Sequence, residues 1–476
     1  MKELIDKIKK NTNESPDILT REIKINNYTI NIIFSETLSS SNLINDFILK
    51  PISSLIIKDK KIDDIYKELK NILSVSSLVE FTNYNDINKY IYNGFTVIII
   101  DLNRFIAVET RASLDRSISI SDSESSITGP KDSFVENLNI NIGLIRKRIR
   151  SKDLYLKKLT IGKSSNTLVG ICYMNNIVDN TLVDKVLSSI KNINIDALID
   201  SSSIKDKIIK KDSLLPVINS TQRPDLVSMA LMEGKVVVLA DNSPYALIIP
   251  SFFIDFFHTA DDYYEKDINI TFIRIIRLLA FLIAVFAPAI YVSVTTHNIE
   301  SIPTSILVNF AYQRMNVPFS GVIEALLMII SFEILRESDT RIPSKMGSSV
   351  SILGGLVLGE AAVSAGIISP IMIIVIAISA VSGLAFSNMS LIYSIRYFRL
   401  ISIFLSAFFG LYGVFISLIF LITKLCSIDS FGYPYMAPFS PFIKEEMKDS
   451  FVKVKRKKKS YRNILLAKKN IIRGRD

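Results

Sequence analysis

The stretch SILGGLVLGEAAVSAGIISP, residues 351–370, holds the residue types that best fit a path for ions. Its small residues recur at intervals of four, three and four positions, so a helix places them on one face. Such a face lets two helices approach closely inside a lipid bilayer. The small residues are Gly355, Gly359, Ala362 and Gly366. The sequence leaves two explanations open, namely tight packing between helices and the lining of an ion pathway.

Three glutamates in the apolar C-terminal part of the chain are candidates for contact with ions. Glu360 is the single charged residue in 347–389, and an ionisable group at that depth costs about 2.5–3.5 kcal/mol unless it faces protein or water. Glu324 and Glu333 are nine residues apart, so they point to opposite sides of a helix and cannot form a paired acid–base site. Glu333 can pair with Arg336 one turn later, which leaves Glu324 as the second pathway candidate.

A break in the chain at Pro370 indicates how such a pathway would be gated. Proline removes a backbone donor and clashes with the preceding turn, so a continuous helix through Pro370 is costly. Irregular backbone at membrane depth persists where it is buried in protein or lines a water-filled cavity. Val363 and Ile367 lie on a different side from the small residues, where they could form a hydrophobic constriction that closes by excluding water.

The remaining chemistry-bearing residues exclude several classes of protein. The chain has two histidines and two cysteines that form no cluster, so we expect neither a metal site nor a disulfide framework. It contains no Walker loop, nucleophile elbow, HExxH motif or kinase signature. We therefore expect no enzyme activity and no cofactor.

Long apolar runs in the C-terminal part predict an all-α polytopic transmembrane domain over residues 270–442. A helix needs about 20 residues to cross the hydrocarbon core, so the long third run is either two crossings or one crossing plus a half-helix. The runs cover residues 278–294, 318–335, 347–389 and 400–423. Counting the third run as one broken element predicts four crossings with both chain ends in the cytoplasm. It also leaves Arg396 and Arg399 outside, against the positive-inside trend.

Basic residues set the expected orientation of the chain. Arg274 and Arg277 precede the first apolar run, which indicates that the region before them is cytoplasmic. Most of the net charge of +10 lies in the tail 443–476, so nucleic acid is not an expected partner. Five consecutive basic residues of this tail are candidates for binding an anionic membrane surface, or serve only to fix the topology. They are Lys455, Arg456, Lys457, Lys458 and Lys459.

The residues before 270 alternate strand-like and helix-like patterns, which predicts an α/β region. The segment 91–110 recurs as 231–250 at a constant offset of 140, with Gly94 matching Gly234. Each copy reads as a helix ended by glycine, then a strand, a turn and a second strand. We therefore expect two related cytoplasmic α/β subdomains. The expected divisions are an N-terminal extension 1–25, subdomains 26–125 and 126–265, the transmembrane domain 270–442 and the basic cytoplasmic tail 443–476.

Four blocks of sequence, in order, resemble the A subunits of GerA-type spore germinant receptors. The blocks are GPKDSFVENLNINIGLIRKRI (129–149), TQRPDLVSMALMEGKVVVLADNSPYAL (221–247), FEILRESDTRIPSKMGSSVSILGGLVLGEAAVSAGIISPIMIIV (332–375) and SFGYPYMAPFSPF (430–442). Gln222 departs from the family pattern, in which a glutamate precedes the Arg-Pro-Asp motif. A sister family, the stage V sporulation AF-type proteins, shares the same blocks.

This resemblance implies a multi-pass protein of the spore inner membrane. It implies a receptor complex in which the A subunit assembles with further copies of itself, with a transporter-like B subunit and with a lipoprotein C subunit. The A subunit would then form a gated ion channel whose opening starts germination. The alternative is a non-conducting scaffold that assembles germination partners.

Overall fold

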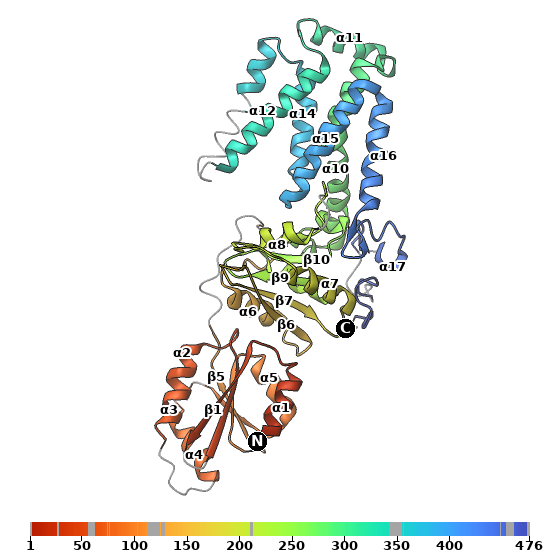
Figure 1. The fold of residues 1–476 in the computed structure, drawn as a ribbon. Helices are drawn as coiled ribbons and strands as arrows, with labels where there is room; N and C mark the ends of the chain where they lie inside the picture. Colours follow the sequence, from red (N-terminus) through yellow and green to blue (C-terminus); the bar gives the residue numbers. More distant parts are fainter. Residues whose placement is uncertain are drawn as a thin grey trace.

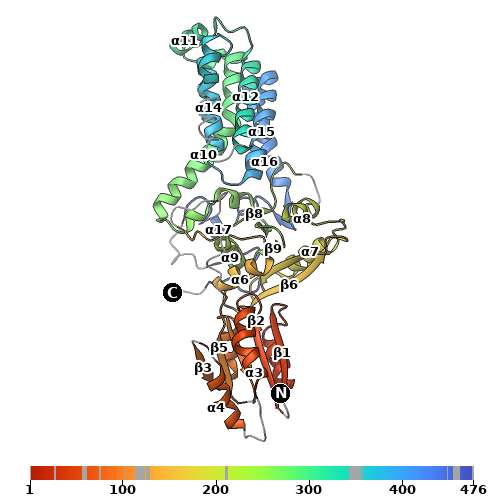
Figure 2. The ribbon, with the colours of Figure 1, turned by 90° about the vertical axis from the view of Figure 1, so that its left-hand side faces the viewer.

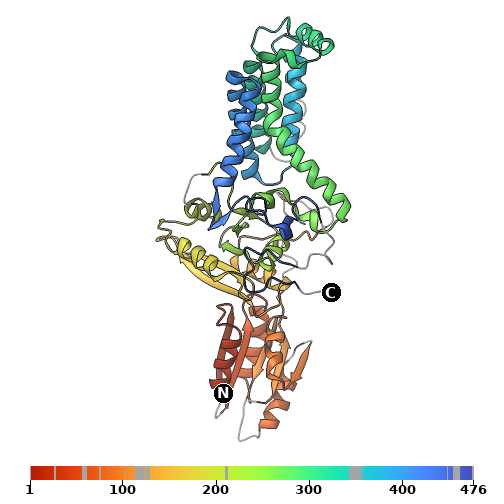
Figure 3. The ribbon, with the colours of Figure 1, turned by 90° about the vertical axis from the view of Figure 1, so that its right-hand side faces the viewer.

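The computed structural model describes residues 2–25, 28–55, 62–73, 75, 77–101, 103–112, 124, 129–209, 213–341, 355, 357–447, 449–453 and 461–473. Within these residues, two α/β units and a bundle of helices follow one another along the chain. The three parts lie in a row, with the first unit at one end and the helices at the other (Figures 1 and 2). The C-terminal segment returns to the side of the second unit (Figure 3).

The first unit is a five-stranded antiparallel sheet with helices on both faces. Its elements are α1 (Lys2–Asn11), β1 (Ile18–Ile25), β2 (Tyr28–Ser35), α2 (Ser41–Ile44), η1 (Asn45–Leu49), α3 (Lys50–Ser53), α4 (Ile62–Ile72), β3 (Leu78–Phe81), η2 (Tyr84–Asp86), α5 (Ile87–Ile91), β4 (Phe95–Ile99) and β5 (Phe105–Glu109). The strand order is β1-β2-β4-β5-β3. Successive side chains of a strand point to opposite faces of the sheet. The side chains of one face pack against α1 and α5, and those of the other face pack against η1, α3 and α4.

Residues 2–25 belong to this sheet, so the N-terminal extension expected over residues 1–25 is replaced by a helix and a strand. β1 pairs with β2 along all eight of its residues. α1 is amphipathic, and its Ile8 is buried against the sheet. The polar sequence concealed this arrangement because β1 is an edge strand with half of its residues exposed.

The second unit is built in the same way. Its elements are α6 (Leu138–Arg148), β6 (Leu154–Ile161), β7 (Thr167–Met174), α7 (Asn180–Lys191), α8 (Ser201–Ile208), β8 (Asn219–Thr221), α9 (Pro224–Met232), β9 (Val236–Ala240) and β10 (Ala246–Ile249). The strands are again antiparallel, in the order β6-β7-β9-β10-β8, which matches the first sheet strand for strand. The shared order confirms the two related units that the repeat predicts.

The repeated glycines have the same role in both units. Gly94 follows α5 with a φ of +81°, and Gly234 follows α9 with a φ of +89°. This backbone conformation favours glycine, which ends each helix before the next strand begins. The pairing registers show that the β9–β10 hairpin is one residue longer than the β4–β5 hairpin.

A buried ion pair joins the two units. Arg146 of α6 binds Asp17, just before β1, with N–O distances of 2.5 and 2.8 Å, and both side chains are at most 1% exposed. Arg146 also donates to the Ser15 hydroxyl at 2.9 Å, and its guanidinium lies over the Tyr92 ring. Burial alone would raise the pKa of Asp17, but the charge and hydrogen bond of Arg146 outweigh burial and hold this pKa below its usual 3.8.

The helical bundle begins with a helix of 30 residues that leaves the second unit. The helices are α10 (Asp267–Thr296), α11 (Thr304–Arg314), α12 (Gly321–Arg341), a helix over residues 357–364, α14 (Pro370–Gly383), α15 (Met389–Phe409) and α16 (Leu411–Ser427). Among the described helices, α10 and α15 are long and apolar enough to cross a bilayer, whereas α14 and α16 are apolar but shorter. The short elements β11 (Asp429–Ser430), β12 (Tyr433–Pro434) and α17 (Lys444–Met447) follow.

The chain reverses at Gly410, so the single span predicted over residues 400–423 is wrong. Phe398 of α15 and Phe420 of α16 lie on either side of this turn with ring centroids 6.2 Å apart, as in an antiparallel hairpin. Gly410 has a φ of +57°, and a side chain at Gly413 would collide with the backbone of α15. Two glycines therefore divide a run that is apolar throughout.

α15 begins against the second α/β unit and ends at the opposite end of the bundle. We call that end, which is farthest from the α/β units, the outer end of the bundle. Asn388, the N-cap of α15, donates to Asn219 of β8 at 2.8 Å. The first residue of α16 donates to Asn298, just beyond α10, at 3.0 Å. Arg396 therefore lies in the half of the bundle nearer the α/β units and Arg399 at the middle of α15, and neither lies on the far side that four crossings would require.

Asp17→Asn should destabilise the protein by about 3–5 kcal/mol, because it leaves a buried guanidinium without its counter-charge. Asp46→Asn is the matched control: Asp46 pairs with Lys50 at 2.7 Å on the exposed surface, where such a pair contributes about 0.5 kcal/mol or less. Urea unfolding of the purified chain, followed by circular dichroism, measures both changes. Equal losses of stability for the two substitutions would show that the buried pair contributes no more than the exposed pair.

The difference between the wild type and Asp17→Asn should also depend on pH in a definite direction. A carboxylate whose pKa is lowered by folding contributes stability above its unfolded pKa near 3.8, and this stability is lost as the pH falls through the folded pKa. The free energies of unfolding of the wild type and of Asp17→Asn should therefore differ most at neutral pH and become equal in acid. A difference that stayed constant into acid would contradict the role of the Asp17 charge.

Candidate functional site

The candidate pore segment contains one helix that ends near Gly366 and a second, α14, that begins at Pro370. Gly366 has a φ of +67°, and the N–H groups of Ile367 and Ile368 both donate to the Ala362 carbonyl, as is common at helix ends. Pro370 occupies the first turn of α14, where its missing N–H leaves no helical bond unmade. The broken element is therefore two helices joined by a tight turn.

The small residues of this segment are only partly packed within one chain. A Cβ built at Gly355 would meet no atom within 4 Å, and one at Gly359 would reach only Ile373, at 4.0 Å. Ala362 packs into a cluster shared by α10, α12 and α14, and Gly366 lies beside the loop before α12. Packing among the described residues thus accounts for one half of the small face and leaves the half around Gly355 and Gly359 open.

The other candidates of this segment lie towards the outside of the bundle. Glu360 is exposed, Ile367 is 40% exposed and Val363 is half-buried. Glu360 therefore has surroundings unlike those of Glu324, which is completely buried.

Glu324 caps α14 at the outer end of the bundle. One carboxylate oxygen accepts hydrogen bonds from the backbone N–H and the hydroxyl of Ser369, at 2.9 and 2.8 Å. Arg314 of α11 lies 3.5 Å from the other oxygen. A carboxylate at a helix N-terminus also complements the helix dipole. Within one chain, this pathway candidate therefore has a structural role that its spacing from Glu333 did not reveal.

Pro288 leaves one carbonyl oxygen of α10 without its helical partner. In a regular helix, the N–H of residue 288 would donate to the carbonyl of Ala284, but proline has no N–H. The Ala284 oxygen instead accepts from the Ser379 hydroxyl of α14 at 2.9 Å and from Nε of Arg399 of α15 at 2.8 Å. Side chains from two helices thus use both lone pairs of one oxygen on a third helix.

Glu333 of α12 pairs with a different residue from the one that helix spacing predicts. It lies 2.9 Å from Arg396 of α15, so it bridges two helices instead of pairing with Arg336 on its own helix. The guanidinium of Arg396 also lies over the Tyr393 ring, 5.0 Å from its centroid. Spacing along α12 could not identify this partner because it belongs to another helix.

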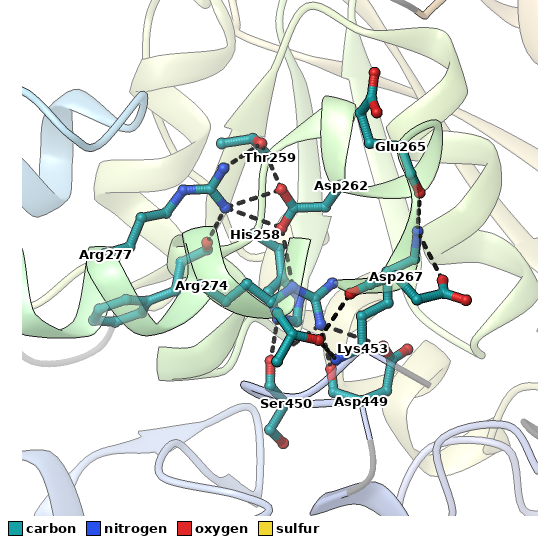
Figure 4. A network of polar contacts seen from close by, with 12 residues as sticks. His258, Thr259, Asp262, Glu265, Asp267, Arg274, Arg277, Asp449, Ser450 and Lys453 are labelled. Atoms are coloured by element: carbon teal, nitrogen blue, oxygen red, sulfur yellow. Dashed lines mark hydrogen bonds and ion pairs between the residues drawn. The ribbon is translucent and has the colours of Figure 1, made fainter. Parts of the chain in front are cut away.

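A network of buried charges joins α10 to the second unit and to the C-terminal segment (Figure 4). Asp262 accepts from Arg274 at 3.1 Å and from Arg277 at 2.9 Å. Arg274 also donates to the backbone carbonyls of Asp449 and Ser450, at 2.9 and 3.1 Å. The side chains of Asp262 and Arg274 are at most 2% exposed. The two arginines, whose place in the sequence indicates only orientation, thus hold the start of α10 in place.

His258 is part of the same network (Figure 4). Its Nε2 lies 2.8 Å from the carbonyl oxygen of Ser450, which can only accept, so this nitrogen carries the proton. Burial and then the positive charge of Arg274 lower the pKa of His258 to about 4. The imidazole is therefore neutral at physiological pH and adds no charge to the junction.

The described part of the C-terminal tail is docked on the second unit. Leu466 is fully buried, and its carbonyl accepts from the N–H of Asp179 at 3.1 Å. Lys468 and Arg473 form ion pairs with Asp179 and Glu233. Part of the basic excess therefore neutralises acidic residues of the α/β region. The five membrane-surface candidates lie outside the described residues; they are Lys455, Arg456, Lys457, Lys458 and Lys459.

Comparison with known proteins identifies the family. A family model described as "Bacillus/Clostridium GerA spore germination protein" matches residues 6–465. The chain belongs to the GerA spore germination family. This confirms the resemblance carried by the four sequence blocks.

Three relatives of this GerA-family chain match it over most of their length. Spore germination protein KA of Bacillus subtilis (strain 168) is 35% identical, over 94% of this chain and 84% of its own. The uncharacterized membrane protein YfkQ of the same strain is 34% identical, over 95% and 88%. Spore germination protein GerQA of Bacillus cereus is 33% identical, over 93% and 88%. The crystal structure of the N-terminal domain of the A subunit of the Bacillus megaterium spore germinant receptor GerK3 aligns with a TM-score of 0.41 at 26% identity, covering 52% of this chain and 94% of that one.

The Arg-Pro-Asp motif of this GerA-family chain forms a buried cluster that the sequence patterns did not reveal. Arg223 binds both carboxylate oxygens of Asp225, at 3.1 and 2.8 Å. Tyr264, just before α10, donates to the same carboxylate at 2.8 Å, and burial together with this carboxylate raises the pKa of Tyr264. The sequence signal for this cluster is an arginine and an aspartate on either side of a proline at the start of a helix. Its partner Tyr264 could not be found without the fold.

Asp262→Asn should destabilise this GerA-family chain by about 3–5 kcal/mol, because Arg274 and Arg277 then lose the counter-charge that they share in a buried site. Glu300→Gln is the matched control, since it removes a carboxylate at an exposed position beyond α10. Amide hydrogen exchange of the purified chain should show loss of protection in residues 444–453 and 267–277 for Asp262→Asn alone. Unchanged protection there would mean that the network does not hold these segments together.

Proposed function

We propose that this chain is the membrane subunit of a spore nutrient germinant receptor, and that its copies assemble into a gated ion channel whose opening triggers germination. Membership of the GerA family and the names of the relatives support the role in spore germination. The proposed partners are a transporter-like B subunit, a lipoprotein C subunit, further copies of this chain and membrane lipids. The proposed location is the spore inner membrane.

The observation that carries the channel proposal is the open half of the small-residue face. Gly355 and Gly359 have no close neighbour on that face among the residues that the structure describes. A face of this kind allows a helix of a second copy to approach closely. If several copies formed a closed ring with contacts through this segment, Val363 and Ile367 would lie towards the axis of the ring. Apolar side chains there would exclude water from a narrow passage. Glu360 would then be the charged group at the mouth of that passage.

Membrane insertion is supported by the apolar surface of the bundle. Four large side chains of α15 and α16 are each more than 60% exposed; they are Phe408, Tyr412, Phe415 and Ile419. Such a surface suits lipid or a neighbouring subunit better than water. The docked tail and the start of α10 both lie at the α/β end, so insertion of the bundle would leave both chain ends on the cytoplasmic side. The basic residues 455–459 would then face the anionic leaflet.

The C-terminal tail should be protected from a membrane-impermeant thiol reagent in right-side-out vesicles. Cys426→Ser removes the exposed native thiol, and Cys172 is buried. In that background, Ile472→Cys in the tail should stay unlabelled, whereas Tyr312→Cys on α11 at the outer end should be labelled. Both positions are exposed in the chain, so the difference reports the side of the membrane. Ready labelling of Ile472→Cys in sealed vesicles would overturn this topology.

Val363→Ala should widen the constriction, so liposomes that hold the assembled chain should release ions without nutrient. Val381→Ala makes the same change on the exposed surface of α14 and should not leak. Gly359→Leu should instead block assembly and abolish conductance, because a large side chain keeps the helices apart. If Val363→Ala leaves the resting permeability of an assembled complex unchanged, this segment is not the gate. If the assembled wild type never conducts, the non-conducting scaffold becomes the better account.

A further inference from the structure

Three arginines and one glutamate gather between α12 and α15, between the middle of the bundle, where Arg399 lies, and its α/β end. Glu333 and Arg336 lie one turn apart on α12, and Arg396 and Arg399 lie one turn apart on α15. The 2.9 Å contact between Glu333 and Arg396 brings the two helix faces together. The group therefore carries three positive charges and one negative charge.

The positive excess has no counter-charge among the residues that the structure describes. Arg399 is 4% exposed, and its hydrogen bond within this part of the chain runs from Nε to the carbonyl of Ala284. No described carboxylate lies within ion-pair distance of Arg399 or Arg336, since Glu333 is taken by Arg396. The nearby C-terminal end of α14 supplies at most about half a negative charge. A buried cation without a counter-charge is strongly disfavoured, so the arrangement calls for an anion.

The guanidinium group of Arg399 remains open to such an anion. The terminal nitrogens of Arg399 have no acceptor among the described residues, yet they are not among the polar atoms that are sealed from solvent. Gly383 of α14 keeps the space beside Nη2 free, because a Cβ there would lie 3.5 Å from this nitrogen. Planar guanidinium donors match the oxygens of a phosphate group in geometry.

The surroundings fit a phosphate that carries acyl chains. Tyr393 and Tyr397, one turn apart beside Arg396, are 48% and 55% exposed, and tyrosines are enriched at the headgroup depth of a bilayer. Ile330 and Ile334 form an exposed apolar track on α12 that leads towards the outer end of the bundle. Tyr393 and Tyr397 lie on either side of Arg396 along α15, and the apolar track of α12 begins beside Glu333, so basic, aromatic and apolar groups lie together as a phospholipid headgroup and chain require.

We propose that Arg336, Arg396 and Arg399 bind the phosphate of an anionic phospholipid between α12 and α15. Glu333 competes with this phosphate for Arg396, so its charge limits the affinity. The site rests on the membrane location in the proposed function, but it does not require the chain to conduct ions.

The test is a titration of the purified full-length chain, in a neutral detergent, with phosphatidylglycerol or with phosphatidylcholine of the same acyl chains. Native mass spectrometry counts the bound lipid, and phosphatidylglycerol should bind more tightly. Arg336→Gln and Arg396→Gln should each weaken its binding about fivefold, the factor for one basic residue near an anionic lipid surface. Glu333→Gln should strengthen it by about the same factor. Lys424→Gln, at the end of α16, removes a charge outside this group and should have no effect.

Equal binding of the two lipids, or equal weakening by Lys424→Gln, would overturn the site. Displacement of the lipid by millimolar inorganic phosphate would also overturn it, because the ligand would then be a free anion. Arg399 is kept in these variants since it also holds α10 through Ala284. Conductance of the same preparations in liposomes separates the two proposals: a chain that binds phosphatidylglycerol as expected and carries no current refutes only the channel.

Discussion

The arrangement of the helical bundle depends on one carbonyl oxygen, that of Ala284. Pro288 removes the N–H that would satisfy this oxygen within α10, and an unsatisfied buried carbonyl costs about 1–3 kcal/mol. Ser379 and Arg399 satisfy it instead, so α14 and α15 are fixed against the part of α10 that precedes Pro288. The same bond brings a guanidinium into the bundle. The position of Arg399, and with it the positive cluster between α12 and α15, thus follows from the proline.

Buried charges hold α10 at its other end as well. Asp262 binds two arginines of the first turns of α10, and Arg274 also binds the chain at Asp449 and Ser450. Removal of one partner from such a group leaves an uncompensated charge, so the contacts resist separation of α10 from the second unit. α10, the first helix of the bundle, is therefore held firmly against the α/β region. The segment around Gly359, by contrast, keeps a face that no described residue covers closely.

Patterns that depend on neighbours along the chain could be predicted, and patterns that depend on other elements could not. The repeat around Gly94 and Gly234 predicts two related units because a glycine turn is a local property, and the strand orders agree. The break at Pro370 is local for the same reason. The reversal at Gly410 was missed because both helices of the hairpin are apolar, and a hydropathy pattern does not show where the chain turns back. The partners of Glu333 and Arg399 were missed because they lie on other helices.

Pro288→Ala tests most directly whether the freed carbonyl organises the bundle. In an isolated helix this substitution is favourable by about 3 kcal/mol, since alanine restores the N–H and removes the clash. In this chain the restored N–H would compete with Ser379 and Arg399 for the Ala284 oxygen, both of whose lone pairs are in use. We predict that urea unfolding of the purified chain will show a lower stability for Pro288→Ala than for the wild type, with weaker amide protection in α14 and α15. A gain in stability approaching the full value for an isolated helix, with protection unchanged, would contradict the central place given to this carbonyl.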